Sequence, residues 1–248
     1  MNTKNKELRV GFWNKGGFWG AKLKTSKHIN ELKYQINKQK TDVLVVCEAN
    51  ATHEDLEKMK IPGYEYKYGS VGLNRIIIIH RNYLVINEIV SHEEIPTICI
   101  TVKYGTENIR IIGLYREFKK IGTRTRTIQQ ETDIFNEFMK SLENEFRNKQ
   151  LIFCGDMNLN WQELDNERYS RKTMLKTLAE KTMGMTQIVT APTRNTRHTQ
   201  TMIDLCFVKG VKHTDAIVEE TINSDHCFIQ TSIITNVTSP KKTIQKKL

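Results

Sequence analysis

Two apolar runs in this sequence stop at a carboxylate. Residues 44–47 lead to Glu48 and residues 151–155 lead to Asp156, and in both cases an asparagine stands two positions after the acid. A buried strand requires the apolar run, but it has no need of a carboxylate where it leaves the sheet. Ligands of α/β proteins bind at the carboxyl ends of strands. The two acids therefore predict one site, built from two halves of the chain.

Other expected strands also begin or end at polar side chains. Asn14 follows the first strand, Tyr115 follows a middle strand, Asp204 opens a later one, and Asp225 and His226 open the last. Carboxylate and carboxamide oxygens are the ligands that Mg²⁺ and Mn²⁺ prefer. A carboxylate that is not a ligand can take a proton from an attacking water, and a histidine beside an aspartate can be kept charged against a phosphate. The set predicts a metal-dependent phosphodiesterase.

The sequence lacks the motifs of several other chemistries. No Gly-x-Ser-x-Gly elbow and no Gly-x-x-x-x-Gly-Lys loop is present, which argues against a serine hydrolase and against a P-loop kinase or ATPase. The five cysteines include no Cys-x-x-Cys pair, and each lies in an apolar run. We therefore expect buried free thiols rather than a disulfide framework or a zinc site.

The chain is basic. Its 248 residues contain 38 lysines and arginines against 28 acidic residues, a formal charge of +10 with a pI near 9.3. This balance favours a polyanionic partner such as nucleic acid or an anionic membrane, and the alternative is an ordinary basic surface. The aliphatic run Ile76–Ile79 is far too short to span a membrane, and the polar N-terminus lacks the apolar region of a secretory signal. We expect a soluble intracellular protein, nuclear when it acts, without a membrane partner.

Strand and helix patterns alternate along both halves of the chain, which is typical of an α/β fold with helices on the outer faces of its sheets. The longest expected helix is Thr127–Arg147, whose apolar positions have helical spacing and which we interpret as a core helix. Strands are expected at Leu8–Trp13, Asp42–Cys47, Tyr64–Tyr68, Arg75–His80, Ile98–Lys103, Ile109–Leu114, Leu151–Cys154, Ile203–Val208 and His226–Ile233, and other helices at Ser26–Lys40, Leu56–Met59 and Arg171–Lys181.

The order of the motifs makes the chain similar to the endonuclease/exonuclease/phosphatase superfamily. Its members include Mg²⁺-dependent apurinic endonucleases, DNase I, deadenylases and inositol-phosphate phosphatases, and the chain most resembles the endonuclease domain of non-LTR (LINE-type) retrotransposons. Each motif is weak alone, but together they form a strong signal: residues 48–50, 114–116, 155–158, 192–194 before 203–204, and 224–226. The resemblance implies a DNase I-like, four-layer α/β sandwich of two packed mixed β-sheets flanked by helices.

The resemblance runs from about Leu8 to Thr235. We expect a flexible N-terminus over residues 1–7, an endonuclease/exonuclease/phosphatase domain over residues 8–235, and a basic tail or linker over residues 236–248. The tail is a candidate connection to a reverse transcriptase, which would be a partner besides double-stranded DNA.

The resemblance also implies where a metal would bind. Glu48 would be the principal ligand of Mg²⁺, or alternatively Mn²⁺, with Asn14 also at the metal and Asp225 close to it. Many repair-type relatives carry a further acidic ligand two positions after the first asparagine, where this chain has Gly16. Related strands often read Gln-Glu-Thr, and here Cys47 precedes the acid and Ala49 follows it. Both departures argue against an abasic-site repair enzyme.

On the phosphate side, the resemblance assigns a role to five residues. Tyr115 would contact the scissile phosphate, Asp156 would activate the attacking water, and Asn158 would position that water or the phosphate. Asp204 would pair with His226, whose other ring nitrogen would face the phosphate.

Hydroxyl and basic side chains are candidates for DNA contact. Thr193 and Ser224 match hydroxyls near the phosphate in LINE-type enzymes. Arg194 opens a basic loop over residues 194–198, and Arg124 and Arg126 lie in a second loop over residues 119–126. Such loops suit contact with a phosphate backbone, and a solvated surface is an equal alternative for the second.

Three functions remain open at this stage. The first is a Mg²⁺-dependent DNA endonuclease that nicks target DNA and leaves a 3′-hydroxyl primer for target-primed reverse transcription. The second is another enzyme of the superfamily, an abasic-site endonuclease or a phosphatase of small phosphate esters, and the positive charge weighs against small substrates. The third is a catalytically silent nucleic-acid-binding module.

Overall fold

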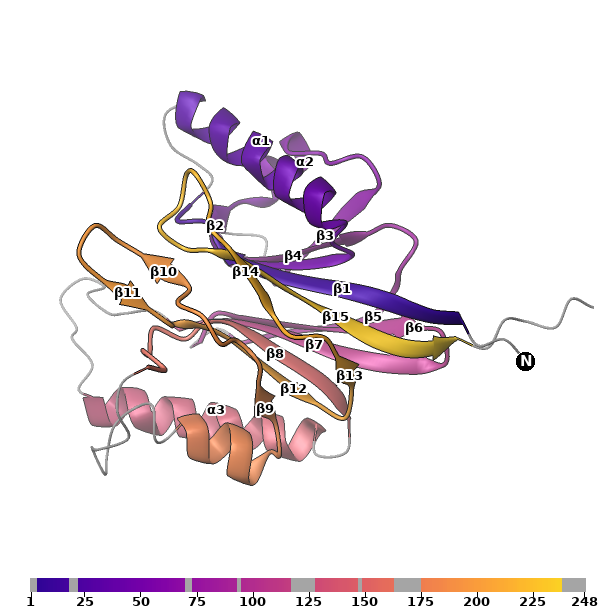
Figure 1. Cartoon of the computed structure of the whole chain (residues 1–248), viewed down its shortest axis with the longest axis vertical. Helices are drawn as coiled ribbons and strands as arrows, with labels where there is room; N and C mark the ends of the chain where they lie inside the picture. The colour runs from indigo at the N-terminus through magenta and orange to yellow at the C-terminus, as the bar shows by residue number, and fades with distance from the viewer. Residues whose placement is uncertain are drawn as a thin grey trace, which may run out of the picture.

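Two β-sheets pack face to face in the computed structural model of the chain, and helices cover their outer faces (Figure 1). The structure describes residues 4–17, 22–69, 73–92, 95–116, 128–146, 149–162 and 175–237. Helices α1 (Lys22–Gln39) and α2 (His53–Lys58) lie over one sheet, and α3 (Ile128–Phe146) and η1 (Thr177–Thr182) lie over the other. The expected four-layer, DNase I-like α/β sandwich is confirmed.

The first sheet joins the two ends of the described chain. Its order is β13-β15-β1-β2-β4-β3, with β14 also paired to β15. Strands β1 and β2 are parallel, and the other pairs are antiparallel. The strands are β1 (Lys4–Asn14), β2 (Val43–Ala51), β3 (Tyr64–Tyr68), β4 (Asn74–Arg81), β13 (Lys212–His213), β14 (Ile217–Glu219) and β15 (Phe228–Val237).

The second sheet repeats this plan. Its order is β5-β6-β7-β8-β12-β9, and β7 and β8 form its parallel pair. The strands are β5 (Val85–His92), β6 (Thr97–Tyr104), β7 (Glu107–Tyr115), β8 (Gln150–Asp156), β9 (Thr186–Gln187) and β12 (Asp204–Lys209), and β10 (Arg194–Asn195) and β11 (Gln200–Thr201) form a separate ribbon.

Each sheet thus contains a strand–helix–strand unit with a parallel pair at its centre: β1-α1-β2 in the first and β7-α3-β8 in the second. In register, Asn14 lies opposite Cys47, and Tyr115 lies opposite Asp156. Parallel strands end at the same edge of their sheet, so each unit delivers its terminal polar residues to one edge.

The main core fills the space between the two sheets. The sheets approach closely at Gly113 of β7, where a Cβ atom would lie 2.5 Å from Val45 and 3.0 Å from Ile76 of the first sheet. All five cysteines are free and buried, as expected. On the outer side of the second sheet, α3 buries Phe135, Phe138, Met139 and Leu142, which confirms its helical apolar pattern.

Several elements differ from the sequence expectation. β1 begins at Lys4 rather than at Leu8, because residues 4–7 pair with residues 234–237 of β15. β5 and the short strands β9, β10, β11, β13 and β14 were not expected, since their alternation is short or interrupted. Within the described ranges, no helix is long and apolar enough to cross a membrane.

Candidate active site

Asn14 joins the two sheets at the expected edge. Its amide nitrogen donates to Glu48 Oε1 at 3.0 Å and to Asp156 Oδ2 at 2.7 Å, and its amide oxygen accepts from the Gly16 N–H at 2.9 Å. The Tyr115 hydroxyl donates to the same Glu48 oxygen at 2.8 Å. Four of the predicted site residues, two from each sheet, therefore form one hydrogen-bonded cluster. In this arrangement the Asn14 amide nitrogen donates to the two acids, and its amide oxygen accepts from the backbone.

The backbone at Glu48 explains how that carboxylate reaches the cluster. β2 does not end at the acid: it continues to Ala51 through a register shift between Cys47 and Ala51. Glu48 and Asn50 have φ of 50° and 48° inside this bulge. Bulges re-aim side chains beside active sites, and asparagine tolerates the left-handed region better than most residues. The irregular backbone therefore turns the half-buried Glu48 side chain toward Asn14 and Tyr115.

A glycine and an asparagine shape the corresponding turn at Asp156. Gly155 has φ of 144°, and a Cβ there would lie 1.8 Å from the Leu114 carbonyl oxygen, so only glycine fits. Asn158 has φ of 47°; its N–H donates to Asp156 Oδ1 at 2.8 Å, and its side-chain amide donates to the Arg116 carbonyl oxygen at 2.6 Å. The asparagine that follows each acid thus has a conformational role in both halves.

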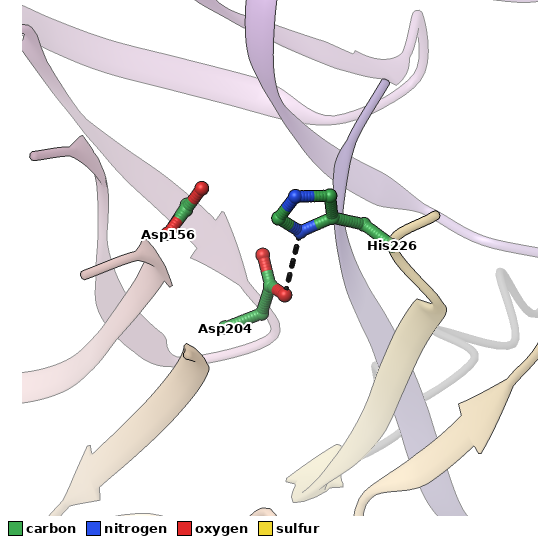
Figure 2. Close-up of side chains that lie close together, drawn as sticks. All are labelled: Asp156, Asp204 and His226. Carbon is green, nitrogen blue, oxygen red and sulfur yellow. Dashed lines mark hydrogen bonds and ion pairs between the residues drawn. The ribbon is translucent and has the colours of Figure 1, made fainter. Parts of the chain in front are cut away.

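Asp204 and His226 form a buried ion pair next to Asp156 (Figure 2). His226 Nδ1 lies 2.8 Å from Asp204 Oδ2, and Asp204 is in direct register with Asp156 on the neighbouring strand. Ligand atoms of these three residues all lie within 4.8 Å of one another. Asp204 Oδ1 is buried and has no hydrogen-bond partner within the described part of the chain. The predicted pairing of Asp204 with His226 is present in the structure.

Burial and neighbouring charge change the protonation of this group. Burial, reinforced by the negative charge of Asp204, raises the pKa of Asp156 well above its ordinary value of 3.8. Burial alone would lower the pKa of His226, but the Asp204 carboxylate outweighs it and raises that pKa to about 9. His226 is therefore an imidazolium at neutral pH, and its second ring nitrogen is a charged N–H donor.

Asp225 lies at the edge of the site and pairs with Arg194. The Arg194 Nε donates to Asp225 Oδ2 at 2.7 Å, and Asp225 Oδ1 lies 4.0 Å from His226 Nε2. Burial would raise the pKa of Asp225, but the Arg194 hydrogen bond and the His226 charge hold it below its ordinary value. Arg194, which the sequence predicted to contact DNA, therefore pairs through its Nε with Asp225, and its side chain remains partly exposed.

The two predicted hydroxyls hold the backbone of the site. The fully buried Thr193 Oγ1 accepts from the N–H groups of Ile203 and Asp204 at 3.1 and 3.0 Å, so it fixes the start of β12 and does not face solvent. Ser224 Oγ donates to the Asn14 carbonyl oxygen at 2.9 Å and accepts from the His226 N–H at 3.1 Å. Arg124 and Arg126 lie outside the described residues.

Two arginines beside the site received no role from the sequence. The buried Arg116 places its Nη1 3.3 Å from the Met157 carbonyl oxygen and 3.4 Å from that of Asn158, which holds the turn after Asp156. Its position directly after Tyr115 was the available signal. The Arg75 guanidinium lies over the Tyr115 ring, 5.2 Å from its centroid, and no local pattern marks it.

The donor set fits a hard divalent cation. Glu48, Asp156, Asp204 and Asp225 provide carboxylate oxygens, and the buried Asp204 Oδ1 lacks a partner within the described residues. Such crowded acids gain from a bound cation, because it removes the mutual repulsion. Asp156, Asp204 and His226 have the spacing of a metal site. The protonated His226 cannot be a ligand, so we expect carboxylates to make the contacts to the cation.

Comparison with known proteins finds one sequence family and several solved structures similar to this chain. A sequence family described as endonuclease-reverse transcriptase matches residues 109–230. No curated protein matches the chain by sequence. The endonuclease domain of TRAS1, a telomere-specific non-LTR retrotransposon, superposes with a TM-score of 0.66 at 18% identity over 92% of this chain and 98% of that one.

Two further structures superpose similarly. The D. rerio TDP2 complexed with single strand DNA product gives a TM-score of 0.69 at 15% identity, covering 92% of this chain and 99% of that one. The AP endonuclease LMAP from Leishmania major gives 0.69 at 13% identity, covering 92% and 87%. Over residues 109–230 the chain is similar in sequence to the endonuclease-reverse transcriptase family, and it shares the fold of these solved structures. It also carries a candidate metal site, in which acids would supply the ligands and His226 lies beside them.

Proposed function

We propose that this protein is a Mg²⁺-dependent DNA endonuclease that nicks one strand of a duplex. The observation that carries the proposal is the Asn14 bridge between Glu48 and Asp156, with the Asp204–His226 ion pair at its side. One edge of the paired sheets thereby offers acids for a cation, a base of raised pKa and a fixed positive charge. These are the parts that hydrolysis of a phosphodiester requires.

The described residues suggest how the reaction proceeds. Asp156 takes the proton of the attacking water, since its raised pKa brings its proton affinity closer to what a base needs near neutral pH. Asn14 and the Asn158 N–H hold this carboxylate in place. The charged His226, fixed by Asp204, donates through its second nitrogen to a phosphate oxygen, where negative charge develops.

On the other side of Asn14, we assign Glu48 and Tyr115 to the leaving-group side of the scissile phosphate. Glu48 would hold Mg²⁺, with Asp225 near it, and the ion when bound supplies positive charge to the phosphoryl oxygens. The Tyr115 hydroxyl, oriented by Glu48, can turn to donate to a phosphate oxygen. Burial, together with the adjacent Glu48 charge, raises the pKa of Tyr115, so the phenol stays a donor throughout the working range of pH.

Two observations favour DNA and a transposon-type role. The chain carries a formal charge of +10, which suits a polyanion better than a small ester. The matched sequence family is described as endonuclease-reverse transcriptase, and a TRAS1 retrotransposon endonuclease shares the fold. We therefore propose that the nick leaves a 3′-hydroxyl that primes reverse transcription by a polymerase, which we propose as the partner of this domain.

A plasmid assay tests the proposal. Supercoiled plasmid incubated with the protein and Mg²⁺ should become open circular, EDTA should stop the conversion, and the nicked product should be extended by a polymerase without end repair. Cleavage restricted to a duplex containing an abasic site, or release of phosphate from a small ester alone, would point to the other enzymes of the superfamily. Duplex binding without any cleavage would point to a catalytically silent module.

A further inference from the structure

A fully buried lysine follows Asn14 directly. Lys15 Nζ lies 3.0 Å from Glu31 Oε2 of α1, with side-chain exposures of 0% and 6% for the two residues, and 4.4 Å from the centroid of the Trp13 ring. Burying an ammonium and a carboxylate is costly, and such a pair can often be replaced by apolar residues without loss of stability. The pair therefore calls for a reason other than stability alone.

Glu31 also holds the loop that carries the catalytic histidine. Its carboxylate accepts from the Ile222 N–H at 2.5 Å, from the Asn223 N–H at 3.2 Å and from the Asn223 side-chain amide at 2.9 Å. Burial would raise the pKa of Glu31, but these bonds, joined by Lys15, hold it below its ordinary value. The Glu31 carboxylate thus anchors the loop at Ile222 and Asn223, the two residues that precede Ser224.

The end of β1 and the residue after it connect to this loop at three consecutive positions, the first two directly and the third through Glu31. The Trp13 indole N–H donates to the His226 carbonyl oxygen at 3.2 Å, and the Asn14 carbonyl oxygen accepts from Ser224 Oγ at 2.9 Å. Lys15 completes the series, since it reaches Asn223 through Glu31. The strand end that presents Asn14 to the acids therefore also sets the position of His226.

Packing contributes little to holding the loop. The Ile222 side chain is 91% exposed, Asn223 is half-buried and Asp225 is exposed. The Ile222 side chain thus lies in solvent, while its N–H is bound by the buried Glu31 carboxylate. This combination indicates that hydrogen bonds, rather than packing, fix the loop. The bonds to Glu31 are then its principal attachment ahead of Ser224.

We propose that Lys15 and Glu31 are positioning residues that keep Asn14 and the 222–226 loop in mutual register, so that His226 meets the phosphate opposite Asp156. This inference rests on the proposed nuclease function. It concerns residues that touch neither the phosphate nor the cation. Misplacing a catalytic group by about 1 Å can cost about 100-fold in rate, so a loosened loop is expected to lower kcat strongly.

The test replaces both charges together. In the double variant Lys15→Met/Glu31→Leu no buried charge is left unpaired, so we expect a melting temperature close to that of the unsubstituted protein. We expect faster amide hydrogen exchange at Ile222 and Asn223, a kcat for plasmid nicking lowered about 100-fold, and a KM changed by less than about threefold. Lys15→Met/Glu31→Gln keeps an acceptor for the loop and also leaves no buried charge unpaired, so compared with Lys15→Met/Glu31→Leu it should restore part of the protection and part of the rate.

The matched control is an ion pair of the same helix. Lys38 of α1 pairs with Glu219 of β14, three residues before Ile222, but that pair is partly exposed. Lys38→Met/Glu219→Leu should leave the exchange of the Ile222 amide and kcat unchanged. A Lys15→Met/Glu31→Leu protein with unchanged kcat would overturn the positioning role, and unchanged exchange at residues 222–223 would overturn the attachment. Absence of nicking by the unsubstituted protein would refute the proposed function instead, and the exchange result would still decide whether Glu31 holds the loop.

Discussion

The two sheets contribute acids to the same site in different states. The first sheet supplies Glu48, half-buried and carried by a bulge of left-handed backbone. The second supplies Asp156 and Asp204, which are buried, adjacent in register and close to an imidazolium. An accessible carboxylate can exchange a cation with solvent, whereas a buried acid of raised pKa can exchange a proton with a bound water. The difference suggests a division of labour between the halves, which four experiments test.

The strongest test removes the proposed base. Asp156→Asn keeps the shape of the side chain and can accept only one of its two hydrogen bonds, from Asn14 or from the Asn158 N–H, and it abolishes proton transfer, so we expect nicking to fall by about 10²–10⁴-fold at every Mg²⁺ concentration. Because burial raises the pKa of Asp156, its ionised form opposes folding above that pKa. At pH 8 the removal of this charge offsets the loss of one hydrogen bond, so the melting temperature should stay close to that of the unsubstituted protein.

Asp42→Asn provides the control for that variant. Asp42 is also a buried acid, which accepts from the Arg9 N–H at 2.9 Å and from the Tyr83 hydroxyl at 2.7 Å, and it precedes the opposite end of β2. It should lose stability and keep its nicking rate at a permissive temperature. An active Asp156→Asn protein would remove Asp156 from the mechanism.

The second test concerns the charge of His226. Nicking should fall as pH rises through about 9, since His226 then loses its proton, and it should also fall toward acid as Asp156 is protonated at a pH well above 3.8. The raised pKa of His226 adds stability that is fully present below its ordinary value of 6.5 and is lost as pH rises through about 9. Asp204→Asn should lower the rate and move the alkaline limb toward 6.5. A nearly harmless His226→Ala beside an inactive Asp204→Asn would show that the pair does not act as a unit.

The third test addresses the accessible acid. Glu48→Gln should raise the Mg²⁺ concentration for half-maximal nicking by at least about 10-fold, with partial recovery at high Mg²⁺, since a carboxamide is a weaker ligand of hard cations. A titration of initial rate against Mg²⁺ measures this. Asp156→Asn should show no such recovery. If both variants responded equally to Mg²⁺, the two acids would share one role.

The smallest effect is expected away from both acids. Arg124→Ala/Arg126→Ala should weaken binding to unrelated duplexes about equally and reduce the log–log salt slope by roughly 0.9 for each lost phosphate contact. The Mg²⁺ requirement should persist, because arginine cannot ligate a cation. The measurement is duplex affinity over a range of salt concentrations, for the unsubstituted protein and the double variant. Parallel salt lines of equal height would show that this loop does not contact DNA.

Much of the framework could be predicted from local pattern. The central strands are continuous apolar runs, and α3 shows a clear helical period, so both were placed to within a few residues. The short strands β9, β10 and β11 could not be predicted in this way, because two residues give no periodicity. For the site, Glu48, Asp156, Asp204 and His226 were identified by their places at strand ends, and the structure brings them together.

The sequence by itself determined which polar groups stand at the strand ends and that two halves of the chain carry similar acid-x-Asn turns. The tertiary structure decided how those groups are used. Pairing of β8 with β12 buries Asp156 beside Asp204 and thereby sets both unusual pKa values, and the packing of α1 against the first sheet places Lys15, Glu31 and Asn223 in one network. The physical reason is that burial and electrostatic coupling depend on which residues far apart in the sequence come into contact. A local sequence pattern does not contain that information.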